Sequence, residues 1–206
     1  MCNLYNQTTA VQAMRGLFKG IENRAGNIET GDVYPDRTAP IITANGEGTR
    51  LGIARWGLPS PKQFHSPSGI DRGVTNVRNS SSPHWRRWLG PEHRCLVPLT
   101  KFAEPRPGKG AGNAWFAVRD DRPAFFAGIW VPQWTSIRKL KDGETTDDLF
   151  AFLTCEPNSI VEPIHPKAMP AILTTEEEWQ IWLMAPWSEA RTLQRPLDDD
   201  QLILVE

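Results

Sequence analysis

The sequence is poor in cysteine and lacks any long hydrophobic run. Its three cysteines, Cys2, Cys95 and Cys155, are odd in number, widely separated and without a C-x-x-C pair. This spacing argues against a disulfide framework and against a zinc ribbon. No apolar run approaches the roughly eighteen residues of a membrane-spanning helix, and the N-terminal segment lacks the basic and apolar regions of a signal peptide. We therefore expect a soluble protein of the cytoplasm.

Glycine and proline are abundant by contrast, with 16 and 18 residues among 206. A backbone that turns this often cannot be built mainly from long helices. A hydrophobic content of 39% beside 23% charged residues is typical of a folded globular chain. The length favours one domain over residues 1–206. We predict an α+β fold with a curved antiparallel sheet or barrel-like core and a few short peripheral helices.

The hydrophobic pattern predicts where the elements lie. Short apolar or alternating runs bounded by Gly, Pro or Asp predict strands at 51–56, 94–99, 113–118, 123–131, 149–154 and 202–205. Helices are predicted at 9–19, from Ser82-Pro83 onward, and after a capping box of Thr175 and Glu178 that turns Trp179, Trp182 and Leu183 inward. Residues 57–84 are expected to form a loop, and residues 104–112 an exposed turn.

The net charge of −1 hides an uneven distribution along the chain. Residues 50–110 hold eleven lysines and arginines against three acids, a surplus of +8. Residues 140–206 hold four basic residues against fourteen acidic ones, a balance of −10. Any contact with a polyanion should therefore involve the middle of the chain, and the near-neutral total does not exclude nucleic acid as a partner.

Cys2 follows the initiator methionine, and a residue this small normally permits removal of the methionine. The exposed residue then carries an α-amine and a thiol on neighbouring carbons. The amine has an ordinary pKa of about 7.7–8.0, so near neutral pH much more of it is a free nucleophile than of a lysine amine. It can form a Schiff base with an aldehyde, and the sulfur can then close a thiazolidine ring. Taken alone, however, a cysteine at this position is more often incidental.

Five segments together carry a resemblance to a known family. They are MCNLY at the start, ARWGL at 54–58, GVTNVRN at 73–79, RCLVPLTKFAEP at 94–105 and IHPKAMPAIL at 164–173. In order and approximate spacing they resemble the motifs of the SRAP family, the SOS response-associated peptidases. The resemblance implies a β-barrel-like α+β fold, a positively charged groove for single-stranded DNA, and covalent capture of abasic sites by the processed N-terminal cysteine.

The partner implied by the resemblance is single-stranded DNA that contains abasic sites. We expect a monomer that needs no cofactor and no metal, does not bind membranes, and is associated with the nucleoid when it acts on DNA. We do not expect His93 and Cys95 to form a metal pair, because no two further ligands lie at suitable spacing.

Four residues match the reactive positions of the family: Cys2 as nucleophile, Asn76, Glu104 and His165. An abasic deoxyribose is mostly a closed hemiacetal, and its opening requires a proton transfer that His165 can perform in either direction. Glu104 can hold the N-terminal amine and carry its proton, and Asn76 can hydrogen-bond the amine or the sugar without adding charge.

The expected DNA contacts combine cations with a stacking face, as in other single-strand binders. The candidates are Trp56, Arg78, Arg86, Arg87, Thr154 and Lys167. Trp85 and Trp88 fit either base stacking or the core, and Arg86 and Arg87 fit either a DNA contact or a solvated face. Asn3-Leu4 stands where typical members have Gly-Arg, so one phosphate contact is expected to be missing.

Two other functions fit parts of this pattern. The first is a peptidase with an N-terminal nucleophile that acts mainly by cleaving its own Met1, with Glu104 and His165 as proton-transfer groups. The second is a noncatalytic module that binds single-stranded DNA and in which Cys2 is incidental. Substitution of Cys2 separates the noncatalytic module from the other two functions.

Overall fold

Five strands close into a barrel at the centre of the structure, a computed structural model that describes residues 2–9 and 11–205. They are β4 (Thr38–Asn45), β5 (Gly48–Trp56), β7 (Arg94–Leu99), β10 (Ala124–Ile137) and β11 (Glu144–Cys155). Four antiparallel pairings link β5, β4, β7, β10 and β11 in that order. The parallel pairing of β11 with β5 closes the cycle. Closure removes the free edges that an open sheet of the same strands would expose.

Aromatic side chains fill the barrel. Because side chains alternate between the two faces of a strand, Phe150 and Phe152 of β11 point to the same side. The ring centroid of Phe152 lies 4.2 Å from that of Phe126 and 5.2 Å from that of Trp56. All four of these rings are almost completely buried. The apolar runs that predict strands in the sequence thus supply the core of the barrel.

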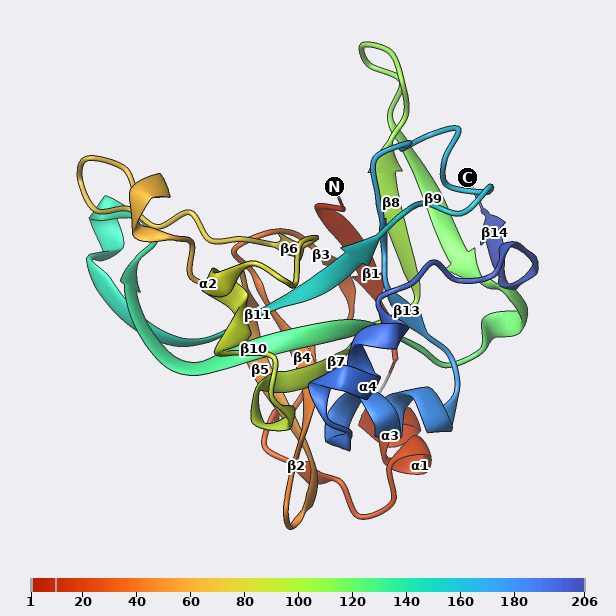
Figure 1. Cartoon of the computed structure of the whole chain (residues 1–206), viewed down its shortest axis with the longest axis horizontal. Coiled ribbons are helices and arrows are strands. Elements are labelled where there is room, and N and C mark those ends of the chain that lie inside the picture. The colour runs from red at the N-terminus through yellow and green to blue at the C-terminus, as the bar shows by residue number, and fades with distance from the viewer. Residues whose placement is uncertain (1, 10, 206) are drawn as a thin grey trace.

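A second sheet of five strands lies beside the barrel and contains the start of the chain. Its strand order is β14 (Leu202–Leu204), β9 (Asn113–Val118), β8 (Lys101–Pro105), β1 (Leu4–Gln7) and β3 (Gly31–Val33). The ring of Tyr5 in β1 reaches the barrel core, 5.2 Å from Trp56 and 5.3 Å from Phe126. This packing fixes β1 against the barrel, and the β8–β9 hairpin projects beside it (Figure 1).

The remaining elements are short. The strands β2 (Glu22–Asn23), β6 (Asn76–Val77), β12 (Met169–Pro170) and β13 (Ile172–Leu173) pair with β5, β11, β11 and β10, respectively. The helices are α1 (Val11–Leu17), α2 (Pro83–Arg86), α3 (Glu176–Met184) and α4 (Trp187–Ala190), all at the periphery (Figure 1). None of the helices in the described residues has the length and apolar character needed to cross a membrane.

The structure confirms the predicted fold class. The capping box is formed, because the Thr175 hydroxyl accepts a hydrogen bond from the Glu178 backbone and the Glu178 carboxylate accepts one from the Thr175 backbone. Trp85 and Trp88 are buried, which assigns both to packing. Cys95 and Cys155 are buried as well.

One part of the predicted pattern is wrong. Residues 104–112 do not form an exposed turn throughout, because β8 continues to Pro105 and the Glu104 side chain is buried. The exposed part of the hairpin begins at Pro105, the last residue of this strand. The prolines and glycines that follow Glu104 favour a turn locally, whereas pairing with β9 keeps the first two residues in the sheet.

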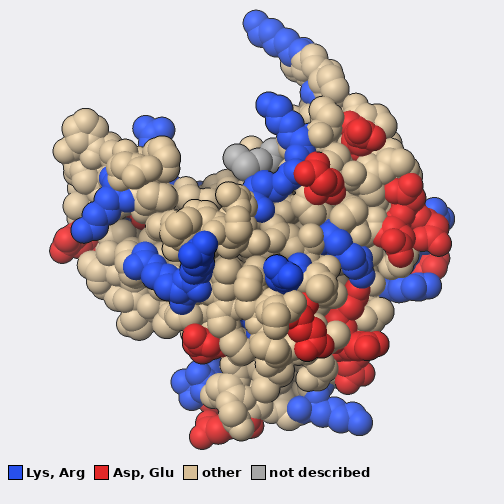
Figure 2. Space-filling model, viewed as in Figure 1, with Lys and Arg blue, Asp and Glu red and all other residues tan. Residues whose placement is uncertain are grey.

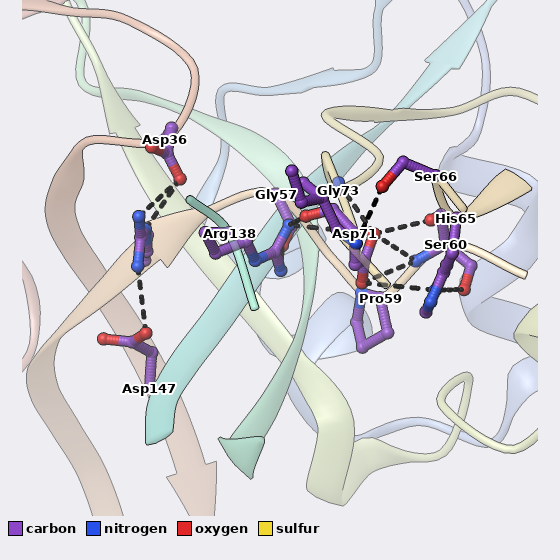
Figure 3. A network of polar contacts seen from close by, with 12 residues as sticks. Asp36, Gly57, Pro59, Ser60, His65, Ser66, Asp71, Gly73, Arg138 and Asp147 are labelled. Carbon is purple, nitrogen blue, oxygen red and sulfur yellow. Dashed lines mark hydrogen bonds and ion pairs between the residues drawn. The ribbon is translucent and has the colours of Figure 1, made fainter. Parts of the chain in front are cut away.

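Residues 57–75, here called the lobe, leave the barrel after β5 and return at β6 (Figure 1). The buried side chain of Arg138 holds both ends of this segment (Figure 3). Its Nη2 donates to the carbonyl of Gly57 at 2.5 Å, and its Nη1 donates to the carbonyl of Asp71 at 3.3 Å. The Asp71 carboxylate in turn accepts a hydrogen bond from the backbone of Gly73 at 2.8 Å. The lobe is therefore anchored directly before Asn76.

Substitution Gly73→Ala is expected to destabilise the fold by about 2–4 kcal/mol. Gly73 has φ +74°, and a Cβ there would lie 2.1 Å from Arg138 Nη1 and 3.0 Å from the Cα of Gly57. The guanidinium cannot move aside cheaply, because it is buried and bonded to two carbonyls. Denaturant unfolding measures the decrease in the free energy of unfolding.

The matched control is Gly110→Ala in the β8–β9 hairpin. Gly110 has φ +78°, and a Cβ added there would meet no atom of the described residues within 4 Å. This variant should lose only the cost of a left-handed backbone, about 1–2 kcal/mol. Equal losses for both variants would show that Arg138 does not constrain the lobe.

Candidate active site

Three elements bring Cys2, Asn76 and Glu104 together. β1 pairs with β8 so that Leu4 lies opposite Ala103, which places the residues before β1 beside Glu104. The amide Nδ2 of Asn76, on β6, donates to the carbonyl of Cys2 at 2.8 Å. The Cys2 side chain is 1% exposed, and the Asn76 and Glu104 side chains are buried as well. The barrel and the second sheet thus meet at this site.

His165 completes the site from the segment between β11 and β12. Its Nδ1 lies 2.7 Å from the carbonyl of Ala168, and its Nε2 lies 4.0 Å from Oε2 of Glu104. A carbonyl can only accept a hydrogen bond, so Nδ1 carries a proton. In the neutral ring, Nε2 is then the unprotonated nitrogen and faces the carboxyl group. The four residues predicted as reactive are far apart in the sequence, and the structure nevertheless brings them together.

Burial shifts the proton affinities of all three titratable groups in this site. It raises the pKa of the Glu104 carboxyl to about 7 and lowers the pKa of His165 below its ordinary value. Burial, together with the negative charge of Glu104, raises the pKa of the Cys2 thiol far above its ordinary range. Near neutral pH the site therefore holds a thiol, a neutral imidazole and a carboxyl group that readily exchanges its proton.

This arrangement suits proton transfer coupled to covalent bond formation. A carboxyl group titrating near pH 7 can act as base or acid, and the adjacent imidazole can relay the proton. Among the residues that the structure describes, no three His, Cys, Asp or Glu side chains form a group suited to a metal ion. The chemistry that these residues support by themselves is nucleophilic addition to a carbonyl.

The residues predicted to contact DNA lie in different environments. Trp56 is 1% exposed, and its indole donates to the carbonyl of Thr75 at 2.9 Å, so it presents no ring face to a base. Thr154 is buried at the end of β11. Arg86 and Arg87 are exposed on and after α2, with the Arg87 guanidinium 4.0 Å from the ring of Trp88. Both arginine side chains are therefore accessible at the surface.

Arg78 is a half-exposed residue whose guanidinium is already engaged. Its Nη1 donates to the carbonyls of Cys155, at 3.0 Å, and Lys167. Its Nη2 forms an ion pair with Glu156. The side chain of Lys167 is exposed. Arg78 therefore ties β6 to the segment that carries His165.

The face around the site is hollowed and carries positive charge. Figure 2 shows a hollow between the lobe, which lies beside the β10–β11 hairpin, and the β8–β9 hairpin, with Lys and Arg side chains on both sides. The start of β1 lies between these projections in the same view (Figure 1). The lobe holds Lys62 and Arg72, and the turn of the β8–β9 hairpin holds Arg106 and Lys109, so both projections carry part of the basic surplus of residues 50–110.

Sequence reasoning missed two residues that support the site. Gln194 bonds the backbone carbonyls of Arg78 and Thr154, and Arg138 anchors the lobe. Neither residue lies in a motif or beside a predicted reactive residue in the sequence. A lone polar residue without a spacing pattern gives no local signal of this role.

Comparisons with known proteins give one family match and several structures of similar fold. A family model described as SOS response associated peptidase (SRAP) matches residues 1–206, the whole chain. The fold is similar to the crystal structure of a protein from Bacteroides thetaiotaomicron, with a TM-score of 0.74 and 22% identity over 100% of this chain and 92% of that chain. No curated protein matches the sequence.

Two structures from Bordetella bronchiseptica are also similar. One has a TM-score of 0.72 and 20% identity, with 100% of both chains covered. The other, described as a phage-related protein, has a TM-score of 0.68 and 18% identity over 99% of this chain and 93% of that chain. At such identities the similarity shows a shared fold.

Proposed function

The chain belongs to the SOS response associated peptidase family, and from this premise we propose that it forms a covalent crosslink with abasic sites in single-stranded DNA. Cys2, after removal of Met1, is the residue that reacts. The observation that carries the proposal is the convergence of Cys2, Asn76, Glu104 and His165, which are far apart in the sequence. An abasic site in its open form presents the aldehyde that an α-amine and a thiol can capture together.

The raised thiol pKa favours a sequence in which the amine reacts first. A protonated thiol is a poor initiating nucleophile, whereas an α-amine with an ordinary pKa of about 7.7–8.0 keeps a reactive neutral fraction near neutral pH. The amine adds to the aldehyde carbon, and loss of water gives an imine. The sulfur then adds to the imine carbon, and the thiol proton passes to the nitrogen, which closes a thiazolidine ring.

Each proton transfer has a group beside it. Glu104 accepts the proton that the amine loses during addition, because its pKa of about 7 lies close to that of the amine. His165 moves the proton that opens the sugar hemiacetal, with Nε2 as the acting nitrogen. Asn76 holds the carbonyl of Cys2 and so orients the residue that reacts.

The DNA strand is proposed to lie in the basic hollow. Contacts by Arg86, Arg87 and Lys167, which are exposed, would make binding dependent on salt. Arg78 would contact a phosphate through Nη2 of its guanidinium, the nitrogen that pairs with Glu156 in the free protein. Trp56 has a structural role in this proposal, because its ring is enclosed by the barrel.

Intact-mass analysis of the purified protein, alone and after incubation with an abasic single-stranded oligonucleotide, tests the proposal. We expect a protein that lacks Met1 and an adduct equal to protein plus oligonucleotide minus one water. The same oligonucleotide with an intact base is the control and should give no adduct. Absence of any adduct with the abasic strand would contradict the proposed function.

A further inference from the structure

The guanidinium of Arg78 has two edges with different surroundings. The Nη1 edge donates to two backbone carbonyls, those of Cys155 and Lys167. The Nη2 edge meets only the carboxylate of Glu156 among the interactions of the described residues. The Arg78 side chain is 38% exposed and that of Glu156 is 78% exposed. One edge thus belongs to the fold, and the other lies at the surface.

The backbone behind Arg78 is held in place by Gln194. The pairing of β6 with β11 ends at Val77 and Leu153, and beyond it the Nε2 of Gln194 donates to the carbonyls of Arg78, at 2.8 Å, and Thr154, at 2.9 Å. One side-chain amide thereby continues the link between the two strands. The direction of the Nη2 edge is consequently set before any ligand arrives, which lowers the entropic cost of binding there.

This edge lies next to the reactive residues. Arg78 follows Asn76 by two positions, directly after the short strand β6. The carbonyl of Lys167 accepts from Arg78, and the carbonyl of the next residue, Ala168, bonds His165. An anion held at the Nη2 edge is therefore adjacent to the groups that act on the sugar.

We propose that Glu156 is an internal competitor of DNA phosphate at Arg78. Its carboxylate occupies the Nη2 edge in the free protein, and a phosphodiester oxygen replaces it when single-stranded DNA binds. An arginine edge that accommodates a carboxylate also accommodates a phosphate oxygen, and an exposed ion pair is weak enough to exchange. Glu156 thereby lowers the affinity for DNA. This inference rests on the proposed function.

The test compares Glu156→Gln with Glu162→Gln. Both substitutions remove one negative charge from the segment that carries His165, and Glu162 is exposed with no ion pair among the described residues. Affinity for an undamaged single-stranded oligonucleotide is measured by fluorescence anisotropy at one fixed ionic strength. Glu156→Gln should bind roughly two- to fivefold more tightly than Glu162→Gln, the gain expected when a weak competing ion pair is lost.

A double-mutant cycle assigns the gain to Arg78. In an Arg78→Gln background, Glu156→Gln should no longer improve binding relative to Glu162→Gln. Equal affinities of the two Glu variants, or a gain that persists without Arg78, would overturn the competitor role while leaving wild-type binding and crosslinking intact. A wild-type protein that neither binds the strand nor forms an adduct would instead overturn the proposed function, and this inference with it.

Discussion

Substitution Cys2→Ser is expected to abolish the heat-stable adduct with abasic single-stranded DNA. Serine is also small enough to permit removal of Met1, so the variant keeps its α-amine and still forms the imine. Its hydroxyl is a weaker nucleophile than a thiol, and the oxygen ring that it would close is less stable than a thiazolidine. A heat-denatured gel and an intact mass should therefore show no adduct.

Borohydride provides the control for this prediction. It reduces an imine to a stable amine, so Cys2→Ser and Cys2→Ala should both be trapped on abasic DNA when the reductant is present. Trapping would show that both variants fold and bind. A heat-stable Cys2→Ser adduct at wild-type yield without borohydride would refute the thiazolidine mechanism.

Substitution His165→Ala is expected to slow both formation and release of the crosslink by about 10²–10⁴-fold, the usual contribution of a general acid/base group. Opening of the sugar and opening of the thiazolidine each need a proton at a leaving heteroatom, and microscopic reversibility assigns one group to both. His165 is not among the proposed phosphate contacts, so affinity for the strand should change little. Single-turnover rates and anisotropy measure the two effects separately.

The pH dependence should separate Glu104 from His165. The Glu104 carboxyl, with its pKa raised to about 7 by burial, is protonated below that pH and ionised above it. Because the ionised form accepts the amine proton, the rate of crosslinking should rise as the pH increases through about 7.

Glu104→Gln should be slow and lack this inflection, whereas His165→Ala should be slow and keep it. Profiles of His165→Ala and wild type that coincide in rate and shape would remove His165 from the mechanism. An inflection that persists in Glu104→Gln would assign the titration to another group, such as the α-amine.

The sequence alone was sufficient for the class of fold and for four of the five barrel strands, β5, β7, β10 and β11. Runs such as 94–99 and 149–154 are apolar because both of their faces are covered, and a local pattern records that burial. The capping box at Thr175 is likewise a contact between residues close in the chain. The four reactive residues were identified by resemblance to family motifs. Their residue types determine which reactions are possible, and this information is present in the sequence.

Only the tertiary structure decided which of these groups meet and what their surroundings do to them. The closure of the barrel through β5 and β11 joins residues about a hundred positions apart, and no local pattern encodes such a pairing. The burial of Trp56, the shift in the Glu104 pKa and the engagement of Arg78 by Glu156 all depend on segments that are distant in the sequence. Residue type determines which reactions are possible, whereas burial and long-range contacts determine the protonation state and orientation in which each group acts.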